Sequence, residues 1–290
     1  MVMHDDSLRD CARLAGLALV EGAKGPELDG VPVQCLTLPV AVGASLETGL
    51  RTAAASALGP GVVLHATASD PDADRCCLVL ERGEPLSPDF AAEGPGGLEA
   101  LGERAAYWQQ CHPPGQLPDS GGYRRGVLQQ QIREQAERAA GRLDASSRAV
   151  LDAELRHQGL YRFEDLPLAG SYWRGVRAFP GGAGLGDLVL PPAAVPAFWQ
   201  IARIVLDVAV DAQGTPQSDA YHSVLAGYHR QRALVGIERG AAPTLLRLAA
   251  LADWLEQLEV GGDGVAERAR LEGLQAHADR LQAVWVRAAA

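Results

Sequence analysis

Residues 161–211, near the middle of the chain, read YRFEDLPLAGSYWRGVRAFPGGAGLGDLVLPPAAVPAFWQIARIVLDVAVD. Apolar runs on either side of GGAGLG (181–186) predict two strands joined by a hairpin turn, because glycine permits the backbone conformations of tight turns. The apolar run that follows, from about Ala193 to Val210, predicts a buried helix. Strand, turn, strand and buried helix therefore form the centre of the expected fold.

Helices are expected on both sides of this central unit. Three are predicted before it, over 98–111, 124–142 and 144–158, the last with Asp144 as its N-cap. A helical pair is predicted after it, over 218–234 and 238–258, and the glycine-rich segment 261–264 leads into an amphipathic helix over 265–287. Residues 87–260 are thus expected to form a helical lobe, with 265–287 as an additional C-terminal helix.

The first 85 residues predict a small α/β lobe. Helices are expected over 6–18 and 45–58, and strands over 17–22, 31–40, 61–68 and 75–82. The segment GEPLSPDFAAEGPGG (83–97) is rich in glycine and proline, which is typical of a linker. We therefore expect a hinge at 81–86 between a lobe of residues 1–85 and the helical lobe.

Composition limits the classes of partner. The 290 residues are 47% hydrophobic, enough for a large core, and their formal net charge is −10. This charge argues against nucleic acid or an anionic membrane surface as the main partner, since both need a basic face. No apolar run reaches the roughly 18 residues of a membrane-spanning helix, and the N-terminus lacks the basic start of a signal peptide. We expect a cytoplasmic protein.

The five cysteines are scattered, without a CxxC spacing, so the sequence predicts neither a metal site nor a disulfide framework. Cys76 and Cys77 are adjacent on an expected strand and face opposite sides, which favours two buried thiols over shared metal ligation.

Several motifs, in this order along the chain, resemble the aminoglycoside phosphotransferase and choline kinase-like superfamily. GEPL (83–86) matches the motif that commonly follows the hinge in that family, and LEALGERAAYWQQC (98–111) is similar to its next helix. VLAGYHRQRALVGIERGAAPTLLRLAALADWLEQL (224–258) resembles the closing helices of the type II homoserine kinase branch. The resemblance covers about residues 20–260. It implies an α+β, bilobal protein-kinase-like fold.

The sequence departs from this family where the chemistry would be. Phosphoryl transfer in this fold needs a strand lysine on the nucleotide phosphates and catalytic-loop and metal-binding carboxylates. The expected lysine position holds Thr37 or Cys35, while Lys24, the only lysine, lies in a turn before that strand. Glu47, on the helix that would supply the ion-pair partner of the lysine, has therefore lost that partner.

The catalytic loop shows the same loss. It reads LPLAGSYWRG over 166–175, and no carboxylate lies in 171–178. Tyr172, Trp173 and Arg174 stand there instead, and Asp187 is the remaining candidate for the metal-binding carboxylate. We expect no catalytic residue and no metal site at these degenerate positions.

We predict a catalytically degenerate phosphotransferase-like protein, a pseudokinase that acts as a binding or scaffold module without a cofactor. Its partner would be a protein or a small anionic ligand, held by stacking and bidentate hydrogen bonds at Tyr172, Trp173, Arg174 and Arg177. The alternative, that Tyr172 and Trp173 fill the former cleft as core, is the interpretation that we favour for these two residues.

Two other functions stay open. A divergent small-molecule kinase would use Asp187 with ATP and Mg²⁺. An adaptor is the third, because residues 5–112 resemble type III secretion chaperones. The two-lobe fold predicts that 81–86 contacts both halves of the chain, whereas the chaperone hypothesis predicts that 1–115 fold alone, as a dimer.

Overall fold

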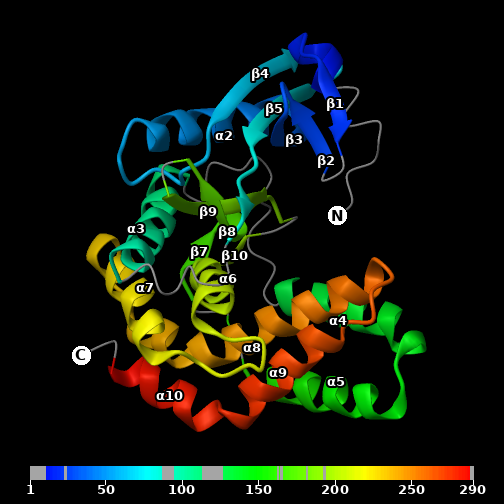
Figure 1. Ribbon diagram of the computed structural model, residues 1–290, viewed down its shortest axis with the longest axis vertical. Coiled ribbons are helices and arrows are strands. Elements are labelled where there is room, and N and C mark those ends of the chain that lie inside the picture. Colours follow the sequence, from blue (N-terminus) through cyan, green and yellow to red (C-terminus); the bar gives the residue numbers. More distant parts are fainter. Residues whose placement is uncertain are drawn as a thin grey trace.

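A computed structural model describes residues 11–22, 25–86, 95–112, 127–161, 163, 166–180, 182–191 and 194–287. The chain forms two lobes, a smaller one built on a curled antiparallel sheet and a larger, mainly helical one (Figure 1). This architecture confirms the expected α+β, bilobal fold. Among the described residues, no helix is both long and apolar enough to cross a membrane.

The sheet of the small lobe has five antiparallel strands in the order β1-β2-β3-β5-β4. Their bounds are β1 Leu19–Gly22, β2 Gly25–Leu28, β3 Val31–Leu38, β4 Leu64–Asp70 and β5 Arg75–Glu81. Helix α2, Val40–Ala54, covers one face of the sheet. Strand β2 occupies part of the segment that we expected to be a turn, so the prediction there was wrong.

The two faces of this sheet belong to different hydrophobic clusters because side chains alternate along a strand. On β3, Leu36 and Leu38 pack on the face that α2 covers, whereas Val33 and Cys35 belong to the opposite face. On β5, Cys76 lies with the α2 face and Cys77 with the other. The predicted alternation of the adjacent cysteines is therefore observed.

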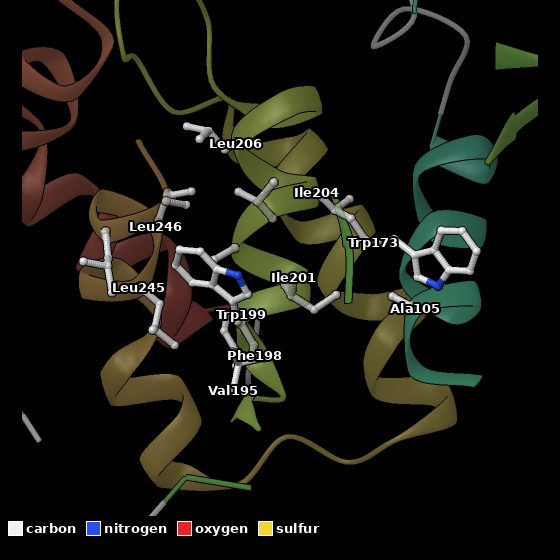
Figure 2. Packing of buried hydrophobic residues seen from close by; sticks show 14 of the residues in the cluster. Ala105, Trp173, Val195, Phe198, Trp199, Ile201, Ile204, Leu206, Leu245 and Leu246 are labelled. Carbon is white, nitrogen blue, oxygen red and sulfur yellow. The ribbon is translucent and has the colours of Figure 1, made fainter. Parts of the chain in front are cut away.

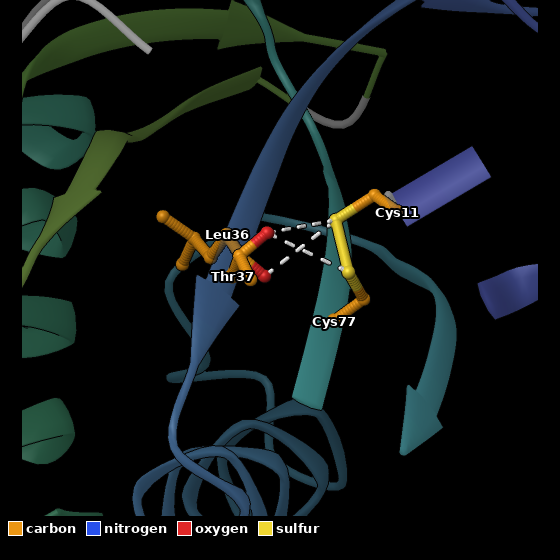
Figure 3. Close-up of a disulfide and its surroundings, with 4 residues drawn as sticks. All are labelled: Cys11, Leu36, Thr37 and Cys77. Atoms are coloured by element: carbon orange, nitrogen blue, oxygen red, sulfur yellow. Dashed lines mark hydrogen bonds between the residues drawn. A yellow bond between two sulfur atoms is a disulfide. The ribbon is translucent and has the colours of Figure 1, made fainter. Parts of the chain in front are cut away.

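Cys77 is not the thiol that we expected, because it forms a disulfide with Cys11 (Figure 3). Residues 11–15 are helical and lie on the second face of the sheet, where both bonded cysteines are fully buried. The bond joins positions 66 residues apart and so ties the start of the described chain to β5. Cys76 is a buried free thiol, as predicted.

The segment between the lobes is hydrogen-bonded to both. On the small-lobe side, the amide of Glu81 donates to Val63 O and that of Arg82 to Pro32 O, each at 2.8 Å. On the other side, β6, Glu84–Pro85, pairs with β8, Tyr172–Phe179. The linker thus contacts both halves of the chain.

The large lobe combines a small sheet with a set of helices. Strand β8 also pairs with β9, Gly182–Val189, while β7, Leu168–Ala169, pairs with β10, Val195–Pro196. The helices are α3 Pro95–Cys111, α4 Val127–Ala139, α5 Ala145–Gln158, α6 Phe198–Ala209, α7 Ser218–Gln231, α8 Gly236–Glu259, α9 Val265–Ala276 and α10 Ala278–Arg287. A 3₁₀ turn, η3 Ala140–Arg142, follows α4.

Helix α6 is the centre of the large core. Figure 2 shows Phe198 and Trp199 near Leu245 and Leu246 of α8, whereas Trp173 lies on the other side against α3. The apolar residues of α6 are buried all round, which is the pattern of a helix enclosed by other elements. The central unit of the sequence is thus also the centre of the large lobe.

Several helix ends differ from expectation. Asp144 caps α5 as predicted, since Ser147 N donates to its carboxylate at 2.6 Å. Helix α2 begins at Val40, five residues before the expected cap Ser45, because it follows Pro39 directly. The single helix expected over 265–287 is divided at His277 into α9 and α10.

Candidate functional site

The candidate site lies where the β8–β9 hairpin meets the linker between the lobes. Asp187 on β9 stands opposite Arg174 on β8 in the strand register. The carboxylate of Asp187 accepts two hydrogen bonds from Arg82, from Nε at 2.9 Å and from Nη2 at 3.0 Å. Only 9% of the Asp187 side chain is exposed. The single candidate metal carboxylate is therefore held by a bidentate ion pair.

Two further guanidinium groups face the same carboxylate. Nη2 of Arg177 lies 3.6 Å from Asp187 Oδ2, and Nη2 of Arg174 lies 3.9 Å from it. Arg174 also donates to Glu256 on α8. Three cations thus converge on one acid, and we call Arg82, Arg174 and Arg177 the arginine cluster.

This arrangement disfavours a divalent cation at Asp187. A metal ion would have to displace the N–H groups of Arg82 and would stand among three positive charges. Within the part of the chain that the structure describes, no group of three His, Cys, Asp or Glu side chains could hold a metal ion. Asp187 acts instead as the counterion of the arginine cluster.

The loop before β8 has been incorporated into the core. Ser171 is 2% exposed; its hydroxyl accepts a hydrogen bond from Trp108 Nε1 at 3.1 Å and lies 3.0 Å from His112 Nδ1. Burial lowers the pKa of His112 from 6.5 to about 4, so this imidazole is neutral at pH 7. This contact was not predicted, because nothing in the residue order of α3 shows that its last turn faces the loop.

Trp173 is a core residue rather than a ligand contact. It is fully buried, and its indole packs edge-on against Trp108, with 5.3 Å between the ring centroids. Its backbone is held by Gln200 of α6, which accepts from Trp173 N at 2.5 Å and donates to Trp173 O at 2.9 Å. Tyr172 is half-buried, edge-on to Trp199. Of the four proposed ligand contacts, the arginines Arg174 and Arg177 are the two placed at Asp187.

Thr37 does not stand where a strand lysine would reach this site. Its hydroxyl lies 3.5 Å from Cys11 Sγ and 3.7 Å from Cys77 Sγ, on the sheet face away from α2 (Figure 3). Cys35 faces the same side. We expected Thr37 or Cys35 at the lysine position. The strand register instead places both on the sheet face away from α2. Lys24 lies outside the described residues.

Gln34 is the β3 side chain that reaches the large lobe. Its amide donates to Leu188 O and accepts from Leu188 N, both at 2.9 Å. Leu188 follows Asp187 directly, so Gln34 fixes the backbone beside the candidate carboxylate. Alternation along VPVQCLTL, which groups Gln34 with Leu36 and Leu38, was the signal that could have identified it.

Glu47 is used within the small lobe. Its Oε1 accepts from Arg51 Nε at 2.9 Å and from Thr67 Oγ1 at 3.1 Å. The Glu47 carboxylate therefore has two hydrogen-bond donors within its own lobe.

One carboxylate from another element reaches strand β8. The Oδ2 atom of Asp207 on α6 accepts a hydrogen bond from Val176 N at 3.0 Å, and burial raises the pKa of this carboxyl. This contact was not predicted, because the residue order of α6 does not show which element packs against Asp207.

No protein-family model matches the chain. Its structure is similar to that of amicoumacin kinase hAmiN in complex with AMP-PNP, Ca²⁺ and Ami, with a TM-score of 0.57 and 13% identity, covering 96% of this chain and 94% of that one. It is also similar to a choline/ethanolamine kinase family protein from Mesorhizobium loti, with a TM-score of 0.52 and 16% identity over 98% of each chain. The chain has the bilobal kinase-like fold. In this kinase-like fold the arginine cluster lies between the lobes, and both neighbours match across the two lobes.

Proposed function

We propose that this protein is a pseudokinase, a kinase-like binding module that does not transfer phosphate. The observation that carries the proposal is the state of Asp187, whose two oxygens accept hydrogen bonds from Arg82 while Arg174 and Arg177 stand close by. A metal-binding carboxylate must offer lone pairs to Mg²⁺, and this one offers them to guanidinium groups.

The loop at Ser171 supports the same proposal. A catalytic carboxylate must reach the hydroxyl group of a substrate, whereas Ser171 is buried against Trp108 and His112. Trp173 is enclosed in the core. The positions that would face a substrate have therefore become packing positions. We also propose that residues 224–258 are related to the closing helices of type II homoserine kinase. We further propose that the protein is cytoplasmic.

The test is phosphoryl transfer from ATP with Mg²⁺ to a panel of amino alcohols and amino acids, including homoserine. We expect no turnover above a heat-treated control. Turnover that falls when Asp187→Asn is introduced would overturn the proposal.

A divergent small-molecule phosphotransferase is the second candidate. Two observations favour it: solved structures with the same fold include proteins named as kinases, and Asp207 brings a carboxylate to the backbone of β8 at Val176. This enzyme would bind ATP with Mg²⁺ at Asp187. It predicts a rise in melting temperature with ATP that requires Mg²⁺, and transfer that is lost in Asp207→Asn or Asp187→Asn.

The adaptor hypothesis is weakened by the packing of α3. A Cβ built on Gly102 of α3 would lie 2.0 Å from Val224 O of α7, and one on Gly227 of α7 would lie 1.9 Å from Glu99 O. The two helices are therefore in backbone contact, so α3 belongs to the core of the large lobe. This contact argues against independent folding of residues 1–115.

A further inference from the structure

The two faces of the small-lobe sheet are covered by different elements. Helix α2 lies on one face, and residues 11–17, which we call the cover, lie on the other. The cluster between the cover and the sheet has five side chains that are at most 1% exposed: Cys11, Val33, Cys35, Cys77 and Val79. Three of the five are cysteines. The cover therefore encloses a small apolar cluster that is rich in sulfur and contains the disulfide (Figure 3).

The cover is attached at its two ends. At one end Cys11 is bonded to Cys77 of β5, and at the other end the chain continues into β1 at Leu19. The helical part of the cover ends at Gly16, whose φ of 62° is in the left-handed region, and a Cβ built there meets nothing within 4 Å. Gly16 and Ala18 are both exposed. These two residues therefore form a hinge once the attachment at Cys11 is released.

The apolar contacts of the cover are incomplete. Leu14 and Leu17 pack against the cluster, but both remain half-buried, and among residues 11–17 only Cys11 is fully buried. Fixing the backbone of a segment costs conformational entropy, which contacts of this kind must offset. The disulfide keeps the cover close to the sheet, so its loss leaves the cover to these partial contacts.

Helix α2 packs more closely on the opposite face. Leu46 is fully buried, Leu50 is 3% exposed, and both belong to the main core. A Cβ built on Gly43 would lie 2.3 Å from Cys76 Sγ, so α2 and β5 are in close contact there. Helix α2 contains no cysteine, so its position does not depend on a disulfide. The adjacent residues Cys76 and Cys77 are therefore covered by elements that are held in place in different ways.

We propose that the Cys11–Cys77 disulfide is a redox gate. When a dithiol reduces it, the cover moves away about Gly16 and Ala18 and opens the second face of the sheet, while α2 and the large lobe stay folded. The chemistry is thiol–disulfide exchange: the dithiol gives up two electrons and two protons, becomes a disulfide itself, and leaves Cys11 and Cys77 as thiols. Oxidation of these thiols closes the gate. The gate does not depend on whether the large lobe transfers phosphate.

The cytoplasmic location that we propose supplies the signal. Disulfides in reducing compartments are usually transient or redox-sensing, so we expect the bond between Cys11 and Cys77 to open and re-form there. Both cysteines are fully buried, so a dithiol reaches the bond through local opening of the cover, and reduction is slower than that of an exposed disulfide. The gate therefore responds to sustained changes in redox conditions.

The experiment follows the reactivity of single thiols in the full chain. Oxidised protein, and protein that is reduced with dithiothreitol and rapidly desalted, are pulsed with N-ethylmaleimide, and mass spectrometry of peptide fragments assigns each label. Cys35 is a free thiol in both states, and we expect its labelling rate to rise at least tenfold on reduction because its cover opens. In the reduced protein, Cys77 should be labelled as fast as Cys35. Cys76 should stay protected by α2 in both states.

Two variants test the role of the bond itself. Cys11→Ser reproduces the reduced state without a reductant, because the disulfide cannot form, and should expose Cys35 and Cys77 to the reagent. Cys111→Ser is the matched control, because it makes the same substitution at a half-buried free thiol at the end of α3. It should leave Cys35 protected in the oxidised protein. Continued protection of Cys76 shows that each variant is folded.

Three outcomes would overturn the proposal. Equal labelling of Cys35 before and after reduction would show that the cover stays in place without the bond. Labelling of Cys76 as fast as Cys77 would show that reduction unfolds the whole small lobe. Treatment of the reduced protein with glutathione disulfide should restore the protection of Cys35, and a failure to do so would show that the change is not a reversible gate.

Discussion

His112 is the residue whose protonation tests how the loop at Ser171 is built. Burial lowers its pKa from 6.5 to about 4, so between these values the unfolded chain binds a proton that the folded chain does not. The contribution of neutral His112 to the free energy of unfolding is therefore fully present above pH 6.5. It is lost as the pH is lowered toward 4. A shift of this size contributes about 3 kcal/mol to the free energy of unfolding over the whole interval.

Urea unfolding at pH 7 and pH 4.5 measures this effect. We expect the loss of stability on acidification to be smaller in His112→Gln than in the unsubstituted protein, because glutamine does not titrate. Equal losses in the two proteins would show that His112 is protonated in the folded state. His229→Gln serves as a control for a histidine at the end of α7 that accepts from Leu234 N.

At the residue scale, the sequence shows which residues stand at the candidate site more readily than it shows which way their side chains face. The sequence alone marks Asp187 as the remaining carboxylate, but it placed Tyr172 and Trp173 in a loop, whereas both begin strand β8. It could not show that Thr37 faces the disulfide and Gln34 the large lobe, because a shift of one residue along a strand exchanges the two faces. Contacts between distant elements, such as that of Arg82 with Asp187, need the three-dimensional fold.

At the element scale, the disulfide is a testable source of stability. Cys11–Cys77 closes a loop of 66 residues, and in the loop-closure model such a bond stabilises the folded state by about 4 kcal/mol. We expect Cys11→Ser to lower the free energy of unfolding by an amount of this order. Reduction with dithiothreitol should have the same effect on the unsubstituted protein and none on the variant.

Cys111→Ser is the control, since Cys111 is a half-buried free thiol at the end of α3. It should not reproduce the loss of stability. A Cys11→Ser variant as stable as the oxidised protein would contradict a structural role for the bond. Disulfides are uncommon in reducing compartments, so this result also bears on the expected cytoplasmic location.

Substitution by alanine should change the stability of the protein in opposite directions at two helical glycines. Gly102→Ala would place a Cβ 2.0 Å from Val224 O and force α3 and α7 apart, which costs about 1–3 kcal/mol. Gly240 of α8 has nothing within 4 Å of its built Cβ, so Gly240→Ala should stabilise the protein by up to about 1 kcal/mol. Thermal or urea unfolding measures both changes. Similar effects of the two substitutions would contradict the close crossing of α3 and α7.

Element types were predicted more reliably than element ends. The periodicity of hydrophobic residues and the helix-capping residues identified α3, α5 and the β4–β5 pair. The N-cap at Asp144 was confirmed. Strand β2 was missed because its residues GPEL read as a turn, and pairing with both β1 and β3 makes them a strand. Pairing with the two neighbouring strands therefore outweighed the preference of these residues for a turn.

At the scale of the whole molecule, the linker makes the two lobes one cooperative unit. Strand β6 pairs with β8, and Gln34 joins β3 to Leu188. We expect a single calorimetric unfolding transition with equal calorimetric and van't Hoff enthalpies. Two separate transitions, with the small lobe unfolding first, would contradict this coupling and would favour the adaptor hypothesis. The bilobal order was predictable from the succession of motifs, whereas the ties between the lobes were not.

The burial of Ser171 has an evolutionary consequence. Restoring a carboxylate at this position, as in Ser171→Asp, would place a charge at a site only 2% exposed, beside the neutral ring of His112. An unpaired buried charge destabilises a protein by several kcal/mol, so His112 would have to take up a proton or the loop would have to leave the core. The arginine cluster would need further substitutions before Asp187 could hold a metal ion. A carboxylate at position 171 would therefore require several simultaneous changes in the core around Trp108 and His112. If the proposed pseudokinase function holds, the packing of this loop would keep a single substitution from restoring a catalytic carboxylate there.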